Sequence, residues 1–531
     1  MRAFRLTDAA LAGLAAGRPS TETLAELRRA QLSRHLILLS KIIREIKTPR
    51  WYAGQPPAEI LADPMTGLYA ATAVAALRSG GQPPDRATLV VPGGRILTSA
   101  RGGRSLRVRL DDADPLRDRL GLQPAARLSD DAAADWQRCL DDAWRILVDR
   151  HPDDAATLAA VLRVIVPVEP DPGAGGVSAT SADAYGAVAM SAPADGVSLA
   201  VGLLHETRHS LLNATRSLFD LVHPSAERGY SPWRDDPRPP SGILHGAYAY
   251  LSVTRFWRTE AARAAGVGSP DGRLAGFEFA RWRAAVVAAA DGLLGGDLLT
   301  AAGRRFVSAL RDEAAGWLHE PVDPEVARLA EGANIDHRVR WRLRNLRVDP
   351  AVAESLATAW RAGRTRPPVP EPAVRPAPHR ELAKSTRLSL IHALLRSPPP
   401  ETGAPPRERA PSSGPGRVGR PRSGPDLSLR NPALQPGGGV RPGDDAYLRG
   451  DHGTAYVAYL QDLLDGTAVR GGTRSAPPAA RPDLEDVWSG LALVMPALRE
   501  RPELVRAVYL ALDVPDPADV DLPGLVAWLA G

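Results

Sequence analysis

Residues 185–221 read YGAVAMSAPADGVSLAVGLLHETRHSLLNATRSLFDL, and this stretch determines the fold that we expect. Its first part is rich in small residues and predicts a loop followed by a strand. A helix is expected directly after the strand, from about Val197 to Leu221. This helix contains the sequence HETRH, which begins at His205 and ends at His209. The pattern therefore places two imidazoles four residues apart on one helix.

Two histidines at this spacing are able to bind one metal ion. Residues four apart lie on the same face of a helix, with Cβ atoms about 5–6 Å apart, so both rings reach a single cation. The alternative is that His205 and His209 are surface or capping histidines without a metal. We favour the metal site because a strand precedes the helix.

A metal site of this kind needs a third protein ligand. We expect it to be His245, which lies near the start of a second helix over about 243–264, in the sequence GILHGAYAY. Its small neighbours Gly242 and Gly246 would let that helix approach a metal closely. The competing ligand is the carboxylate of Glu260, the arrangement of many zinc peptidases. Without a metal, His245 would be a core histidine bonded to the backbone.

Glu206 is the candidate catalytic residue of the motif. It points about 100° away from His205 around the helix axis, so we do not expect it to share the metal easily. A carboxylate in this place is suited to act as a general base or to support a metal ligand. The alternative is an ion pair with Arg208 or Arg216 on the same helix.

Residues 231–240, SPWRDDPRPP, connect the two helices and are expected to form a loop. They carry Arg234 and Arg238, and a guanidinium binds a carboxylate through two parallel hydrogen bonds. Both arginines are therefore candidates for binding an organic acid cosubstrate beside the metal. An equally weighted alternative is that they pair with Asp235 and Asp236 or with other carboxylates of the loop.

The rest of the chain predicts a predominantly helical α+β protein. Apolar residues recur at helical spacing over 21–48, a helix pair is expected over 57–80, and helices continue to about residue 362. Short strands and a hairpin are expected over 88–110, and LRVIVPVE predicts a further strand. We therefore expect the HExxH helix to lie next to a small β-sheet.

Composition divides the 531 residues into three parts. Residues 1–365 are expected to form a metal-dependent catalytic domain. Residues 366–443 contain 18 of the 50 prolines and predict a Pro/Arg-rich linker, largely disordered, with one short helix at about 380–395. Residues 444–531 are expected to form a C-terminal helical module of the tetratricopeptide kind.

Charge and cysteine content limit the class of protein. The net charge is +5, but residues 361–443 hold 15 basic and 5 acidic residues, so the rest of the chain is net acidic and a nucleic-acid partner is not expected. Cys139 is the single cysteine, which excludes a disulfide framework and a cysteine-built metal site. No run of 18 apolar residues suggests a membrane span. We therefore expect a cytoplasmic protein, and the sequence leaves the oligomeric state open.

Two regions resemble a known family. The run from AVAMSAP through LLHETRHSLLNA, continued by SPWRDDPRPPSGILHGAYAYLSVTRFW, resembles the αKG-HExxH-type peptide β-hydroxylases. These are HExxH proteins found with ribosomally made, post-translationally modified peptides. The segments RGDHGTAYVAYLQDLL and VWSGLAL are also similar to that family. The resemblance covers most of residues 20–360 and much of 444–510, and it is most specific over 185–260.

The resemblance implies a non-haem iron(II) dioxygenase. Such an enzyme would use 2-oxoglutarate and O₂ to hydroxylate a β-carbon in a residue of a precursor peptide. His205 and His209 would be iron ligands and His245 the third. By their position, Arg234 or Arg238 would bind the 2-oxoglutarate carboxylate.

One departure concerns the ligand set. Non-haem iron oxygenases commonly use two histidines and one carboxylate, so Glu260, Asp235 and Asp236 stay open as ligands. A second departure is Arg208, which stands where this family often has glutamine.

Two other functions stay open. In a zinc metallopeptidase, Glu206 would activate a zinc-bound water, and Glu260 would complete the ligand set with the two histidines. In a non-enzymatic scaffold, a closed four-ligand metal site would stabilise the fold, and the C-terminal helices would bind a partner.

Overall fold

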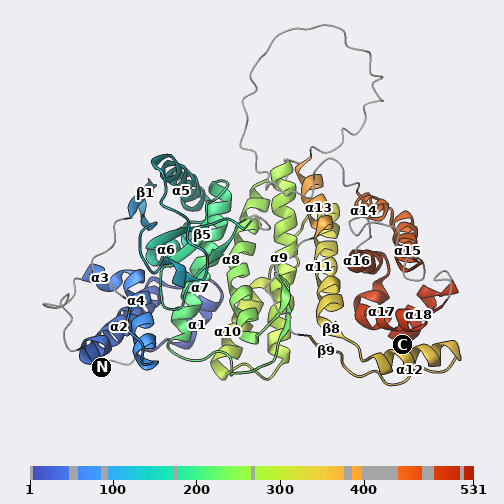
Figure 1. Cartoon of the computed structure of the whole chain (residues 1–531). Coiled ribbons are helices and arrows are strands. Elements are labelled where there is room, and N and C mark those ends of the chain that lie inside the picture. Colours follow the sequence, from blue (N-terminus) through green and yellow to red (C-terminus); the bar gives the residue numbers. More distant parts are fainter. Residues whose placement is uncertain are drawn as a thin grey trace, which may run out of the picture. The chain divides into compact units, whose positions relative to one another are not determined.

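The computed structural model describes residues 4–46, 58–84, 94–171, 176–264, 269–375, 385–397, 440–468, 484–514 and 519–531 (Figure 1). The chain divides into two compact units, and each is described by itself. The first unit comprises the described parts of Met1–Asp220, Tyr248–Ala275 and Leu395–Asn431. The second unit comprises the described parts of Leu221–Ala247, Gly276–Leu394 and Pro432–Gly531.

The first unit contains a five-stranded sheet with helices on both of its faces. Its elements, in chain order, are α1 (Asp8–Ala15), α2 (Thr21–Ile46), α3 (Ala58–Ala62), α4 (Pro64–Arg78), β1 (Arg95–Arg101), β2 (Arg104–Leu110), the 3₁₀ turn η1 (Arg117–Leu120), α5 (Asp130–Arg150), α6 (Pro152–Val161), β3 (Val164–Val168), β4 (Ser178–Ala179), β5 (Ala187–Ser191) and α7 (Gly196–Arg216). The helix α8 (Pro240–Ala264) begins in the second unit and belongs to the first from Tyr248 onward.

The strands of this sheet follow the order β1-β2-β3-β5-β4. β1 and β2 form the antiparallel hairpin that the sequence predicts, and β4 is antiparallel to β5. β3 is parallel to both β2 and β5. Parallel strands need a crossover connection, and α5 and α6 provide it between β2 and β3.

Side chains of the two central strands alternate between the faces of the sheet. Ile165 and Val188 pack with apolar residues of α5 and α7 on one face, and Val164 and Val166 pack with α2 and α4 on the other. Every residue of β3 and β5 is buried, as is typical of strands covered on both faces. An HExxH helix next to a small sheet, in a predominantly helical α+β protein, is therefore confirmed.

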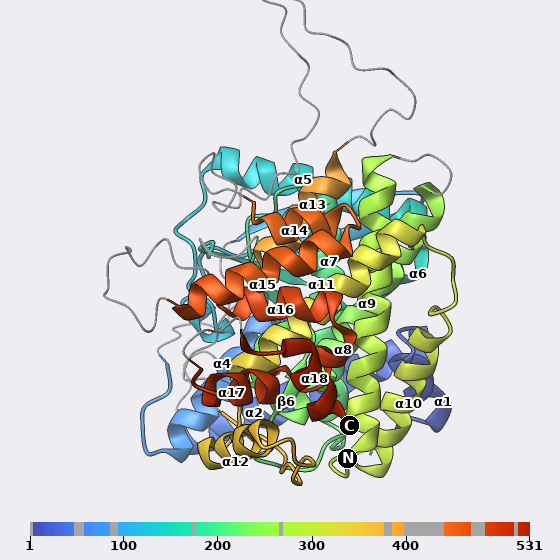
Figure 2. The ribbon, with the colours of Figure 1, turned by 90° about the vertical axis from the view of Figure 1, so that its right-hand side faces the viewer.

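The second unit is helical apart from two short two-stranded sheets. Its elements, in chain order, are β6 (Gly229–Ser231), β7 (Arg234–Arg238), α9 (Pro270–Gly295, in this unit from Gly276), α10 (Ala301–Ala315), α11 (Pro324–Asn345), β8 (Leu346–Arg347), α12 (Pro350–Arg361), β9 (Ala373–Val374), α13 (Thr386–Arg396), α14 (Pro442–Leu448), α15 (His452–Ala468), α16 (Leu484–Val494), the 3₁₀ turn η4 (Pro496–Arg499), α17 (Pro502–Ala511) and α18 (Leu522–Ala530). Figure 2 shows α15 and α16 lying side by side.

The C-terminal helices share one apolar core with two earlier helices. Val339 and Leu343 of α11 and Leu356 of α12 pack in the same cluster as Tyr459 and Trp488. Residues 444–531 therefore bury apolar surface against α11 and α12 as well as among themselves, and the division into three domains stays a prediction. Composition marks a proline-rich segment, but it does not show which helices cover each other.

Two elements lie inside the predicted linker, β9 and α13. α13 confirms the short helix that we expected at about 380–395, and its Ile391 is fully buried. Residues 376–384 and 398–439 of the linker lie outside the described residues, and so does the expectation that this segment is largely disordered.

The apolar stretch near the N-terminus forms α1. The Thr7 side chain accepts a hydrogen bond from the backbone N–H of Ala10 at 3.1 Å, which satisfies one of the free donors at a helix start. Over the described part of the chain, no helix combines the length and hydrophobicity that crossing a membrane would require.

Candidate metal centre

The helix α7 starts and ends at identifiable signals. The Asp195 side chain accepts a hydrogen bond from the backbone N–H of Ser198 at 2.7 Å and so caps the helix. Leu199 and Leu203 are fully buried in the core that α7 shares with the sheet, and they fix the side of the helix that faces the strands. α7 ends at Arg216, five residues before the expected end at Leu221.

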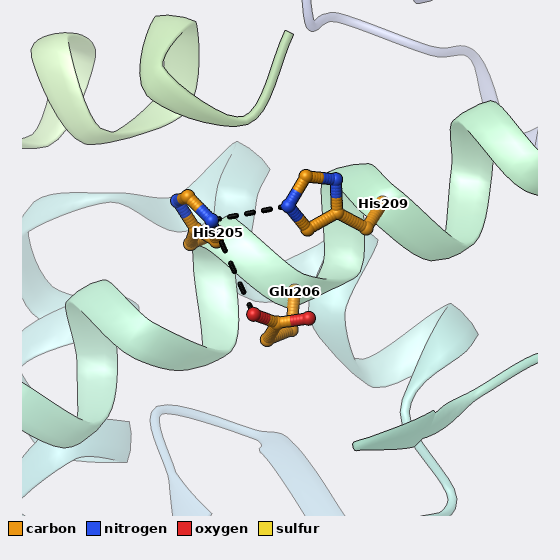
Figure 3. Close-up of side chains that lie close together, drawn as sticks. All are labelled: His205, Glu206 and His209. Atoms are coloured by element: carbon orange, nitrogen blue, oxygen red, sulfur yellow. Dashed lines mark hydrogen bonds and ion pairs between the residues drawn. The ribbon is translucent and has the colours of Figure 1, made fainter. Parts of the chain in front are cut away.

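His205 and His209 direct their rings toward one point (Figure 3). Their Nε2 atoms are 3.1 Å apart, and the ring planes are nearly perpendicular at 84°. Two nitrogens that each lie about 2.1 Å from one ion are about 3.0–3.4 Å apart for ligand angles between a right angle and a tetrahedral one. The observed separation therefore fits two ligands of a single metal ion.

Glu206 joins these two histidines, which differs from our expectation. One of its carboxylate oxygens lies 4.0 Å from His205 Nε2, and one ligand atom from each of the three residues lies within 4.8 Å of the others. The separation of about 100° around the helix does not keep Glu206 away, because its long side chain bends toward His205. Among the residues that the structure describes, this is the one group of three or more such side chains close enough to hold a metal ion.

Ser178 of β4 holds the Glu206 carboxylate in place. Its hydroxyl donates a hydrogen bond to Glu206 Oε1 at 2.7 Å. Glu206 is 2% exposed, and its Oε2 atom has no hydrogen-bond partner within the described part of the chain. A buried carboxylate oxygen without a partner is unusual in folded proteins.

Both imidazoles are held in the neutral form. Desolvation by the surrounding protein, with a smaller contribution from the neighbouring His209, lowers the pKa of His205 to about 4, although Glu206 opposes the shift. Desolvation also lowers the pKa of His209 to about 4. Neutral imidazole is the form that binds a metal, so no proton has to be displaced at pH 7.

Two further side chains, Tyr250 and Arg208, position the motif through contacts that the sequence does not indicate. Tyr250 of α8 packs edge-on against the His205 ring, with 5.2 Å between ring centroids. Arg208 points away from the histidines and pairs with Asp154 of α6 at 2.6 Å. The alternative in which Glu206 forms an ion pair with Arg208 is therefore not observed.

Glu260 does not lie in this cluster. Its carboxylate accepts a hydrogen bond from Arg150 at 2.6 Å and lies 3.0 Å from His151 Nε2. Burial raises the pKa of Glu260, but His151 and Arg150 outweigh this effect and hold the pKa below its usual range. Both carboxylate oxygens are thus engaged by cationic or hydrogen-bonding partners. The carboxylate that we considered as a third ligand is used instead to connect α8 with the end of α5.

Arg234 and Arg238 lie on β7, where we had expected a loop. The strand pairs with β6 in a short antiparallel hairpin. Arg234 Nε and Arg238 Nη1 both donate to the carboxylate of Asp236, each at 3.0 Å. Pairing with the neighbouring aspartate, the alternative that we had weighed equally, is therefore observed. Arg234 Nη2 and Arg238 Nε are buried and have no hydrogen-bond partner among the residues described.

His245 lies on α8 in the second unit and is partly buried. The small residues beside it have a packing role that we had not expected. A Cβ atom at Gly246 would lie 1.9 Å from Trp233 Nε1, and a Cβ at Gly242 would lie 3.3 Å from Arg238 Nε. Gly246 therefore makes room for the indole of the β6–β7 hairpin. The role of His245 as third ligand stays a prediction.

The site thus contains two neutral imidazoles and one carboxylate, which are three possible ligands of one metal ion. The donor types suit zinc as well as iron(II). Comparison of the chain with models of known protein families, and with curated proteins, found no match.

Proposed function

We propose that this chain is an iron(II)- and 2-oxoglutarate-dependent dioxygenase that hydroxylates a residue of a ribosomally synthesised peptide. The observation that carries the proposal is the distance of 3.1 Å between the Nε2 atoms of His205 and His209, beside the carboxylate of Glu206. The type of reaction rests on the sequence resemblance to peptide β-hydroxylases.

His205 and His209 would hold the metal, and their Nε2 atoms, 3.1 Å apart, suit two ligands of one ion. His245, near the start of α8, is the third ligand that we propose.

The donors on β7 fit a carboxylate cosubstrate. Asp236 neutralises one positive charge, but Arg234 and Arg238 together carry two. Each guanidinium keeps one buried nitrogen without a partner among the described residues. A buried donor without an acceptor is unfavourable, and a carboxylate oxygen would satisfy it. These two atoms are the place where we expect one carboxylate of 2-oxoglutarate to bind.

Iron(II), when bound, supplies the redox chemistry by which O₂ and 2-oxoglutarate hydroxylate an unactivated C–H bond. The protein contributes positioning. Ser178 fixes one oxygen of Glu206, and Tyr250 fixes the ring of His205. The carboxylate of Glu206, whose Oε1 lies 4.0 Å from His205 Nε2, would accept a proton from water or substrate beside the two histidines.

Glu260, the carboxylate ligand that the zinc-peptidase alternative requires, is engaged elsewhere. Arg150 and His151 engage both oxygens of Glu260, so that alternative would need a different carboxylate. The other carboxylates that we considered as ligands are also engaged in ion pairs. Arg344 pairs with Asp235, and both Arg234 and Arg238 pair with Asp236.

The proposal is tested by reconstituting the full chain anaerobically with iron(II), adding 2-oxoglutarate and O₂, and measuring succinate. Candidate precursor peptides are then examined by mass spectrometry for the gain of one oxygen atom. We expect succinate release in the wild type and its loss in His205→Ala and His209→Ala. His223→Ala is a matched control, because His223 is exposed and lies outside the cluster. Tight zinc binding together with peptide cleavage, and no succinate, would contradict the proposal.

A further inference from the structure

A second group of buried polar side chains lies in the second unit, and we call it the Tyr230 cluster. It consists of Tyr230, Asp235, Arg281, His337 and Trp341. Successive residues of a strand point to opposite faces, and paired residues of an antiparallel hairpin share a face. The register of the β6–β7 hairpin shifts between Gly229 and Ser231, so contacts distinguish its two sets of side chains: Tyr230 and Asp235 bind residues of α11, whereas Arg234 and Arg238 bind Asp236. The two sets of donors are therefore separate.

Contacts with α11 hold the cluster together. The Tyr230 hydroxyl lies 3.0 Å from His337 Nδ1, and the Tyr230 ring packs edge-on against Trp341 with 5.3 Å between centroids. His337 and Trp341 are four residues apart and so share one face of α11. Arg344 of the same helix binds the Asp235 carboxylate at 2.9 Å. The hairpin and the helix thus fix the directions of these side chains.

Arg281 of α9 is a buried cation that forms no ion pair of its own with the residues that the structure describes. It is 8% exposed, and its guanidinium lies over the ring of Trp282, 4.2 Å from the centroid. Glu278 of the same helix is close enough for Arg281 to help lower its pKa, but that carboxylate accepts a hydrogen bond from Trp282 Nε1 and lies 3.0 Å from His392 Nε2.

Asn334 of α11 donates a hydrogen bond to the backbone carbonyl of Arg281 at 3.0 Å, and His337 follows it by three residues on the same helix face, so Arg281 lies beside the face of α11 that carries the cluster. Burial lowers the pKa of His337 to about 3, and the positive charge of Arg281 adds to that shift. An unpaired buried charge is strongly unfavourable unless an anion compensates it.

Three donors of the cluster have no acceptor. Arg281 Nε, His337 Nε2 and Trp341 Nε1 are buried and have no hydrogen-bond partner in the described part of the chain. The side chain of His337 is 10% exposed, and Trp341 is 5% exposed. The nearest carboxylate oxygen, on Asp235, is 3.7 Å from His337 Nε2, which is too long for a hydrogen bond. Since Tyr230 occupies Nδ1, the neutral imidazole carries its proton on Nε2 when the hydroxyl donates.

We propose that Arg281, His337 and Trp341 form a binding site for the carboxylate of a small organic acid. A carboxylate offers two oxygens with several lone pairs, which match a guanidinium and two ring N–H groups. The bound acid would neutralise Arg281 and satisfy all three donors. The site requires no metal and none of the residues assigned to the dioxygenase. Its existence is therefore independent of the proposed function.

The test is a calorimetric titration of the metal-free full-length protein with succinate. Wild type is expected to bind saturably. Trp341→Phe keeps an aromatic ring but removes one N–H donor, and we expect the affinity to fall about threefold to tenfold. Arg281→Gln removes the charge and should lower the affinity at least tenfold. Circular dichroism of each variant confirms that it is folded.

Matched controls separate this site from others. Trp144 in the first unit also has a buried Nε1 without a partner among the described residues, so Trp144→Phe should bind succinate as the wild type does. Arg238→Gln tests the carboxylate site on the other face of the hairpin. The proposal is overturned if wild type does not bind succinate, if binding is lost in Arg238→Gln and kept in folded Trp341→Phe and Arg281→Gln, or if inorganic phosphate binds at these residues while succinate does not.

Discussion

Arg208 and Asp154 form a buried ion pair beside the two histidines. Arg208 Nη2 donates to Asp154 Oδ1 at 2.6 Å, and the side chains are 2% and 6% exposed. Arg208 directly precedes His209, and Asp154 lies in the first turn of α6. The pair therefore fixes the rotation of α7 about its axis, and with it the direction in which both imidazoles point.

Removing one partner of this pair should destabilise the first unit. Arg208→Ala or Asp154→Ala leaves one buried charge uncompensated, and we expect a loss of about 3–5 kcal/mol in the free energy of unfolding, measured by urea denaturation. The double variant Arg208→Met/Asp154→Leu should lose less, because neither charge stays behind. Arg145→Ala, which breaks an exposed pair on α5, serves as the control and should change stability little. Equal losses in Arg208→Ala and Arg145→Ala would show that the buried pair has no special role.

Glu260→Gln distinguishes a structural carboxylate from a metal ligand. Arg150 and His151 bind this side chain, so the variant is expected to lower thermal stability and to leave the metal content unchanged. Metal content is measured by mass spectrometry of the purified, reconstituted chain, beside His205→Ala, in which the metal should be lost. If Glu260→Gln removed the metal as completely as His205→Ala does, the peptidase ligand set would be restored.

Ser178 is expected to position Glu206 without touching the metal. Ser178→Ala removes the hydrogen bond of 2.7 Å to Glu206 Oε1, so turnover measured as succinate release should fall about tenfold, with metal content at the wild-type level. Ser178→Thr keeps the hydroxyl and should recover most of the turnover. A merely structural serine would instead give equal losses in stability for both variants and an unchanged turnover per folded molecule.

Stability at acid pH should depend on Asp336. Burial raises its pKa, but the charges of Arg387 and Arg340 outweigh burial and hold the pKa below the usual range. A lowered folded-state pKa contributes stability above the unfolded value of about 4, and this contribution is lost as the pH falls through the folded value. Asp336→Asn should therefore be about 3 kcal/mol less stable than wild type at pH 7, and the difference should shrink below about pH 4. Urea denaturation at pH 7 and pH 3 measures both differences, and a gap that stayed constant with pH would contradict this account.

The HExxH helix and its strand could be predicted because local periodicity carries the signal. Residues at steps of three and four mark α7, and the fully apolar run at Val164–Val168 marks β3. The paired histidines follow from the helical repeat alone, so His205 and His209 were predicted together. The prediction that Glu206 points away from the two histidines was wrong. A long side chain rotates about its own bonds, so its carboxylate need not follow the direction of its Cβ.

Longer-range contacts could not be predicted from the sequence. Ser178 reaches Glu206 because β4 joins the edge of the sheet beside β5, and nothing in a stretch of small residues marks that serine. The β6–β7 hairpin was missed because prolines at 232, 237, 239 and 240 suggested a loop, whereas a two-stranded ribbon tolerates proline wherever no ladder hydrogen bond is needed. The division into units depends on which apolar faces meet, which is a tertiary property.

Arg387 on α13 connects segments that lie before and after residues 398–439 of the chain. It pairs with Asp336 of α11 and donates to Asp444 of α14 at 2.9 Å, and all three side chains are buried. The stretches before and after residues 398–439 are therefore anchored to a common set of charges. Two separately expressed polypeptides, one ending and the other beginning between residues 398 and 439, should therefore associate through these buried charges.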